Sequence, residues 1–115
     1  MRLVFFGARL NIKKARGVLS SAIGVEDIDT IEKLIKNGAR INMKNSNYVP
    51  PILMAINRDN YEIVELLIQK RVNLDAKDGE GNTVLDYTRR YDGKELMEFL
   101  LKKGIFTKNK VRKMF

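Results

Sequence analysis

Residues 50–71, PPILMAINRDNYEIVELLIQKR, contain the pattern that decides the fold. Pro50 and Pro51 suit the first turn of a helix, where a proline costs no hydrogen bond, so we expect a short helix over 51–58. Asp59 and Asn60 then indicate a turn. Apolar residues follow at helical spacing and predict a second helix over 61–70. The stretch therefore predicts helix, turn and helix.

The residues after this stretch predict an extended finger. Arg71 stands directly after the second helix, at the left-handed cap position that favours glycine. The following residues 72–81, VNLDAKDGEG, are typical of an extended arm that ends in a tight turn. One unit is therefore helix, turn, helix and finger.

This unit recurs along the chain with a period of 33 residues. Leu34 falls on Leu67 and Leu67 on Leu100, while Gly38, Arg71 and Gly104 share one position. One unit cannot bury its apolar face alone, whereas stacked copies can. We therefore predict one repeat domain over 1–106 and a basic tail over 107–115. The domain comprises a partial unit 1–16 and units of about 17–44, 45–77 and 78–106.

Two openings in the repeat resemble a known family. Pro50-Pro51-Ile52-Leu53-Met54-Ala55 and Thr83-Val84-Leu85-Asp86-Tyr87-Thr88 are similar to the Thr-Pro-Leu-His-x-Ala opening of ankyrin repeats. The resemblance implies an all-α ankyrin-repeat solenoid of stacked helix-turn-helix units with β-hairpin-like fingers. Ser20, Leu53 and Asp86 replace the family's histidine, and Arg71 replaces its capping glycine. A left-handed Arg71 costs on the order of 1 kcal/mol, so we expect modest stability.

The ends of the repeat pose an open question. Leu3–Phe6 resembles the end of a second helix with no first helix before it, and an uncapped array end exposes apolar surface. The chain is then a piece of a longer array, or a short protein with an improvised cap. A third alternative is that Leu3–Phe6 pairs as a strand or docks on a partner. Ile105-Phe106 and Met114-Phe115 raise the same question at the other end.

The net charge of +8 is concentrated at the two ends of the chain. Residues 1–16 hold five basic residues and residues 102–115 hold six, with no acid in either stretch. A nucleic-acid-binding face usually spreads positive charge over one surface, so we favour solubilising ends. The alternative function is binding of nucleic acid or an anionic membrane through the basic tail. If the tail carries the function, deleting residues 107–115 should abolish binding. If the repeat domain binds a protein, the deletion should leave binding intact.

The sequence argues against an enzyme. Histidine and cysteine are absent, which excludes Ser-His and Cys-His catalysis and zinc sites built from those ligands. Asp75, Asp78 and Glu80 form the densest acidic group, but a calcium loop needs more ligands at set spacing. We predict no catalytic residue, no metal and no cofactor. No apolar stretch reaches the length of a secretory or membrane-spanning segment.

The resemblance implies a partner-binding concave face made of the fingers and the exposed side of the first helices. Tyr91 beside Arg90 and Arg89 is the predicted hot spot, because Tyr and Arg dominate binding energy at interfaces. The equal alternative is that Tyr91 packs over a neighbouring turn. The complete candidate set is Lys44, Ser46, Asn47, Tyr48, Val49, Asn57, Arg58, Lys77, Glu80, Asn82, Arg89, Arg90 and Tyr91.

The leading hypothesis is a non-catalytic protein-binding module, such as an adaptor, an effector or an immunity-type inhibitor. Basic residues on the fingers and helix ends suggest an acidic protein partner, and nucleic acid is disfavoured. A third hypothesis is a structural spacer or a self-associating array. We expect a monomer or weak self-association, in the cytoplasm or in a host cytoplasm for a microbial effector.

Overall fold

The computed structural model describes residues 17–90 and 94–103, except for the side chain of Arg90. Within this part of the chain six α-helices form three consecutive pairs, and no residue lies in a β-strand. The pairs are α2 (Val18–Gly24) with α3 (Ile28–Lys36), α4 (Pro51–Asn57) with α5 (Tyr61–Gln69), and α6 (Val84–Arg90) with α7 (Lys94–Lys102). The prediction of a repeated all-α architecture is confirmed.

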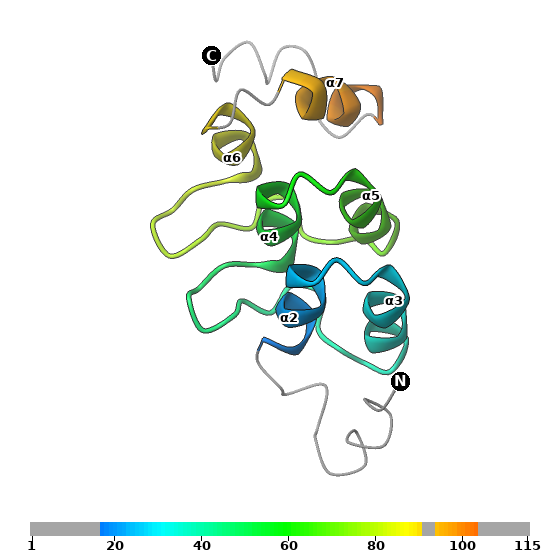
Figure 1. The fold of residues 1–115 in the computed structure, drawn as a ribbon. Helices are drawn as coiled ribbons and strands as arrows, with labels where there is room; N and C mark the ends of the chain where they lie inside the picture. The colour runs from blue at the N-terminus through cyan, green and yellow to red at the C-terminus, as the bar shows by residue number, and fades with distance from the viewer. Residues whose placement is uncertain (1–16, 91–93, 104–115) are drawn as a thin grey trace.

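The helix pairs stack into two layers. Figure 1 shows α2, α4 and α6 in one column and α3, α5 and α7 in a second. The inner helix α4 contacts both α2 and α6 as well as its own partner α5. The loops that follow α3 and α5 project beyond the inner column as two fingers (Figure 1). Each finger therefore lies beside an inner helix, as the repeat predicts.

Local sequence signals set the ends of these helices. Pro50 is the N-cap of α4 and Pro51 its first residue, as predicted. Asp27 accepts from the backbone N–H of Thr30 at 3.2 Å, and Asn60 accepts from that of Ile63 at 3.1 Å. The Thr30 hydroxyl also donates to Asp27 at 2.7 Å, and these bonds lower the pKa of the Asp27 carboxyl. Equivalent caps thus begin α3 and α5, 33 residues apart.

Left-handed residues recur with the same period. Gly38 has φ 100° and Arg71, at the equivalent position, has φ 64°. The backbone N–H of Arg71 donates to the carbonyl of Ile68 at 3.0 Å, just as that of Gly38 donates to Ile35 at 3.1 Å. For a residue with a Cβ this conformation costs about 1–2 kcal/mol. A cation at a helix end returns only about 0.3–1 kcal/mol, so the fold alone gains nothing from an arginine here.

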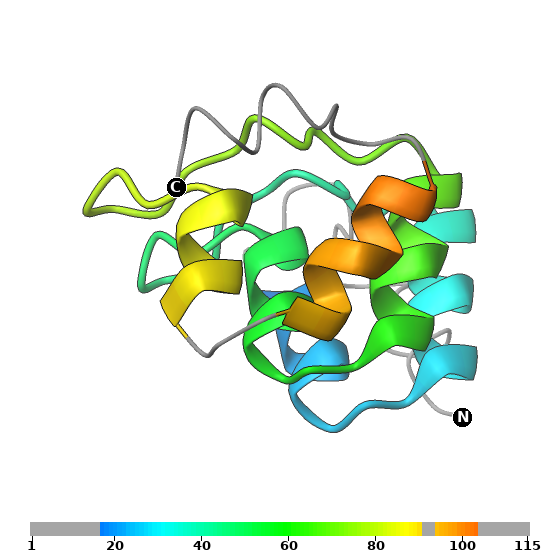
Figure 2. The same cartoon turned by 90° about the horizontal axis from the view of Figure 1, so that it is seen from above.

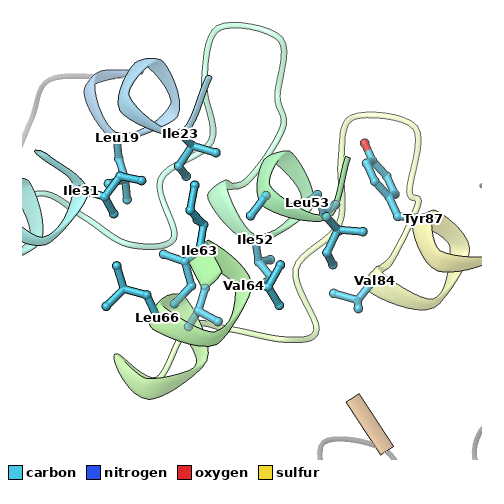
Figure 3. Packing of buried hydrophobic residues seen from close by; sticks show 14 of the residues in the cluster. Leu19, Ile23, Ile31, Ile52, Leu53, Ile63, Val64, Leu66, Val84 and Tyr87 are labelled. Atoms are coloured by element: carbon cyan, nitrogen blue, oxygen red, sulfur yellow. The ribbon is translucent and has the colours of Figure 1, made fainter. Parts of the chain in front are cut away.

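The apolar core runs through the stack between the two layers. Figure 3 shows side chains from α2 to α6 meeting in it, among them Ile23, Ile52 and Leu53. These three side chains are completely buried, as are Ile31, Ile63, Val64, Leu67 and Leu100. The small residues at equivalent positions of the three inner helices, Ala22, Ala55 and Thr88, are also buried. A small buried residue therefore recurs at one position of each inner helix, which favours close approach of neighbouring helices.

Several sequence predictions lie outside the described residues. They concern Leu3–Phe6 and the rest of the partial unit 1–16, Tyr91, Ile105-Phe106 and the tail 107–115. The domain limits at 1, 106 and 107 therefore stay predictions.

Candidate partner-binding face

The first finger ends in a turn organised by one asparagine side chain. The Asn45 carbonyl oxygen Oδ1 accepts from the backbone N–H of Asn47 at 2.8 Å and of Val49 at 3.1 Å. The backbone N–H groups of Asn45 and Tyr48 close the same turn, donating to the carbonyls of Val49 and Asn45 at 3.0 Å each. Such side-chain to backbone bonds fix a turn without a strand ladder. The fingertip turn is therefore held by its own hydrogen bonds, and its residues do not lie in a β-strand.

Tyr48 stands on this fingertip in a strained and exposed conformation. Its φ is 63°, whereas the equivalent position of the second finger is Gly81, with φ 85°. The side chain is 61% exposed, although tyrosine usually gains by burying its ring. A Cβ atom added to Gly79 of the second finger would lie 3.2 Å from the Cβ of Tyr48. The two fingertips are therefore close together. The ring is thus presented to solvent from a fixed base.

The second finger repeats the turn with a carboxylate. Asp78 Oδ1 accepts from the backbone N–H groups of Glu80 and Asn82, both at 2.9 Å. Oδ2 accepts from Asn82 Nδ2 at 3.1 Å and from the hydroxyl of Tyr87 at 2.8 Å. Tyr87 belongs to α6 and is 5% exposed; Figure 3 shows its hydroxyl pointing toward the finger. Asp78 therefore ties the second fingertip to an inner helix.

These bonds change the acidity of Asp78. Partial burial acts to raise its pKa, but the bonds from Asn82, Tyr87 and Glu80 outweigh burial and lower the pKa from 3.8 to about 2. Hydrogen bonds to the charged form thus stabilise the folded state as long as the carboxyl is ionised.

We expect the lowered pKa of Asp78 to make the folded protein lose stability in acid. The folded pKa lies below the unfolded one, so the contribution is complete above about pH 5 and falls between pH 4 and pH 2. The shift corresponds to about 2 kcal/mol, which solvent screening reduces to roughly 1 kcal/mol. Urea titrations of the protein and of its Asp78→Asn variant from pH 6 to pH 2 measure it. Equal acid sensitivity of the two proteins would contradict the assignment.

Comparison with known proteins identifies the repeat. A family model described as ankyrin repeats, in three copies, matches residues 19–111. The chain belongs to the ankyrin repeat family. Ankyrin repeats are protein–protein interaction modules, and this array shares their helix pairs and fingers.

Similar ankyrin sequences occur in proteins of diverse kinds. A putative ankyrin repeat protein of fowlpox virus is 30% identical over 105 residues, 88% of this chain and 25% of that protein. The transient receptor potential cation channel subfamily A member 1 of Homo sapiens is 30% identical over 89 residues, 75% of this chain and 8% of the channel. An I-kappa-B like protein N2 of Microplitis demolitor bracovirus is 39% identical over 56 residues, 48% of this chain and 31% of that protein. The chain thus spans less than a third of each of these relatives.

The structure brings most of the predicted site residues to the ankyrin fingers and inner helices. On the first finger Val49 is half-buried and packs against the core. On the second finger Asn82 is half-buried and bonded to Asp78. The exposed members of the set are Lys44, Ser46, Asn47, Tyr48, Asn57, Arg58, Lys77, Glu80 and Arg89. The Arg90 side chain and Tyr91, the predicted hot spot, lie outside the described residues.

Arg58 also makes a contact inside the ankyrin array. Its guanidinium donates to the carbonyl of Gly24, the last residue of α2. Nearby, Asn60 Nδ2 donates to Glu26 Oε1 at 3.1 Å, which joins the same two units. Sequence reasoning missed both ties, although residues 34 apart in a 33-residue repeat are neighbours in the stack. Arg58 is therefore less available to a partner than Tyr48.

Within residues 17–90 and 94–103 no group of three or more acidic, histidine or cysteine side chains is placed to hold a metal ion. Asp78 is occupied by the bonds of its own finger. No described helix has the length and apolar character needed to cross a membrane.

Proposed function

We propose that this chain is a non-catalytic module that binds a partner protein on its concave face, with Tyr48 as an anchor. The face comprises the two fingers and the exposed side of the inner helices. Adaptors, effectors and immunity-type inhibitors are the classes of protein in which such a module acts. The proposal includes a cytoplasmic setting, or a host cytoplasm for an effector.

The observation that carries the proposal is the conformation of Tyr48. A left-handed tyrosine costs about 1–2 kcal/mol, and the equivalent position of the next finger has the glycine that avoids this cost. The ring also forgoes most of its burial. Residues with a strained backbone that the surrounding structure holds in place cluster at functional sites. A rigid aromatic side chain loses little entropy on binding, which suits an interface anchor.

The surrounding side chains favour contact with a protein rather than with a small molecule. Lys44, Ser46 and Asn47 are exposed around the first fingertip, and Lys77 and Glu80 around the second. This is an aromatic anchor with a polar rim on a projecting surface, as at the centre of a protein interface. The lysines favour carboxylates on the partner and faster association with it.

The substitution Tyr48→Gly tests this proposal. It removes the ring but keeps the left-handed backbone, so the array is expected to keep or slightly raise its stability. Affinity capture from a lysate of the source organism, with mass spectrometry, identifies a retained protein, whose affinity is then measured by calorimetry. We expect Tyr48→Gly to weaken that affinity about tenfold or more.

The matched control is Val25→Ser, since Val25 is an exposed apolar residue, 74% accessible, in the turn between α2 and α3 away from the fingers. It is expected to leave the affinity unchanged. A partner that binds Tyr48→Gly as tightly as the intact protein overturns the anchor. A partner lost only on deletion of residues 107–115 moves the function to the basic tail.

A further inference from the structure

The C-terminal ends of the outer helices form a second charged surface, away from the fingertips. Lys36 is in the last turn of α3, Lys102 in that of α7, and Lys70 and Arg71 directly follow α5. All four side chains are exposed. Figure 2 shows these three helix ends on the same side of the molecule. We call these four residues the basic edge.

Acidic side chains gather at the opposite ends of the same helices. Asp29, Glu62 and Glu95 lie in the first turns of α3, α5 and α7, one at each level. Charge is therefore distributed unevenly along α3, α5 and α7, with these acids at the start and the basic edge at the end. Part of this pattern is explained by the helix dipole, which favours acids at the start and bases at the end of a helix.

Helix dipoles do not explain Arg71. Lys70 already supplies a cation at the end of α5, and the equivalent of Arg71 in the preceding unit is Gly38. The left-handed Arg71 backbone is strained, with φ 64°, and its side chain makes no burial gain because it is exposed. Arg71 thus adds an exposed cation beside Lys70 that the turn itself does not require.

The charges of the basic edge are not neutralised within the described residues. In residues 17–90 and 94–103 the single ion pair joins Lys103 Nζ to Glu65 Oε1 at 2.7 Å. Glu32 and Glu98 precede Lys36 and Lys102 by one helical turn but form no ion pair with them. The four cations therefore remain available to an anionic partner.

We infer that the basic edge binds an acidic, extended polypeptide segment. Stacked helices lie about 10 Å apart. An extended chain advances about 3.3 Å per residue, so carboxylates three residues apart reach successive levels of the array. Single-stranded nucleic acid is disfavoured because its binding sites stack bases on aromatic side chains. The aromatic residues of the outer helices, Tyr61 and Phe99, instead stack on each other at 5.5 Å.

The basic edge is expected mainly to raise the rate at which the acidic segment associates with the array. Exposed ion pairs are individually weak, so the segment contributes through the rate of encounter and through salt dependence more than through lifetime. The inference does not depend on Tyr48, because the probe below is a peptide of glutamates. It has no apolar side chain that would pack against the Tyr48 ring.

The probe is a peptide of fifteen glutamates carrying a nitroxide spin label, added to the full chain labelled with nitrogen-15 at low salt. We expect broadening of amide signals around Lys36, Lys70, Arg71 and Lys102, and little broadening at the fingertips. The edge variant combines Lys36→Gln, Lys70→Gln and Arg71→Gly. The matched control combines Lys44→Gln, Lys77→Gln and Lys94→Gln, three exposed cations elsewhere, for the same change in charge.

The edge variant is expected to bind the peptide about fivefold more weakly and the control less than twofold, and 0.3 M salt abolishes the difference. Circular dichroism checks that both variants are folded, and Tyr48→Gly should bind the peptide like the intact protein. Equal losses in the two variants, or broadening confined to residues outside 17–103, overturn the inference. Tighter edge-dependent binding of a fifteen-nucleotide oligothymidine would assign the edge to nucleic acid instead.

Discussion

Leu53→Ala is expected to lower the free energy of unfolding by about 3–4 kcal/mol. Leu53 is completely buried in α4, the inner helix that contacts α2, α5 and α6. The substitution removes apolar contacts and leaves a cavity that the packed stack cannot close. Because each ankyrin unit is stabilised by its neighbours, damage to α4 weakens both flanking units. Urea unfolding followed by circular dichroism measures the effect.

Val25→Ala provides the control for this experiment. It also shortens an aliphatic side chain, but one that is 74% exposed, so the expected change is below about 0.5 kcal/mol. Native-state hydrogen exchange of Leu53→Ala should show faster exchange in α2 and α6 as well as α4. A loss below about 1 kcal/mol, or exchange confined to α4, would contradict this account of the stack.

The fold was predictable because the same helix-turn-helix pattern occurs in three successive units of the sequence. Helices expected over 51–58 and 61–70 are observed at Pro51–Asn57 and Tyr61–Gln69, so both start as expected and each ends one residue earlier. The expectation that Arg71 would be left-handed is confirmed by its φ of 64°. Caps, periodicity and turn residues are local signals, and here each one agrees with the others.

The contacts between units were not predictable in the same way. The bond from Arg58 to Gly24 and the contact of Tyr48 with Gly79 join residues that are distant in sequence. Their existence depends on how the units are stacked, which periodicity alone does not specify. The predicted site residues stay predictions for a related reason, because family position indicates which face is variable but not which side chain binds.

The positions where ankyrin repeats usually have a histidine show what the sequence does and does not predict. The three residues that replace this histidine differ in their environments. Leu53 is buried in the core. Asp86 Oδ2 accepts a hydrogen bond from the Thr83 hydroxyl at 3.0 Å and so helps to cap α6. Ser20 is buried, and its hydroxyl has no hydrogen-bond partner among the described residues. A buried polar group without a partner costs about 1–3 kcal/mol. The sequence located these departures, and only the packing around them separates the stabilising replacement from the destabilising one.

Asp78→Ala is expected to cost about 3 kcal/mol, because four hydrogen bonds to a charged acceptor are lost together. Two of them shape the fingertip and one holds the finger to Tyr87 of α6. The variant should therefore loosen residues 77–82 as well as lower the urea midpoint. Amide exchange at Glu80 and Asn82 reports the loosening directly.

Asp78→Asn separates the two roles of this carboxylate. Asparagine already performs the backbone role in the first finger, where Asn45 accepts from Asn47 and Val49. The fingertip should therefore persist in Asp78→Asn, at a cost of only about 1 kcal/mol, while the part of the acid sensitivity between pH 4 and pH 2 that comes from Asp78 is lost. If both variants destabilise equally, the charge itself and not the turn geometry holds the finger. If neither variant destabilises the protein, the bonds to Asp78 contribute nothing net to its stability.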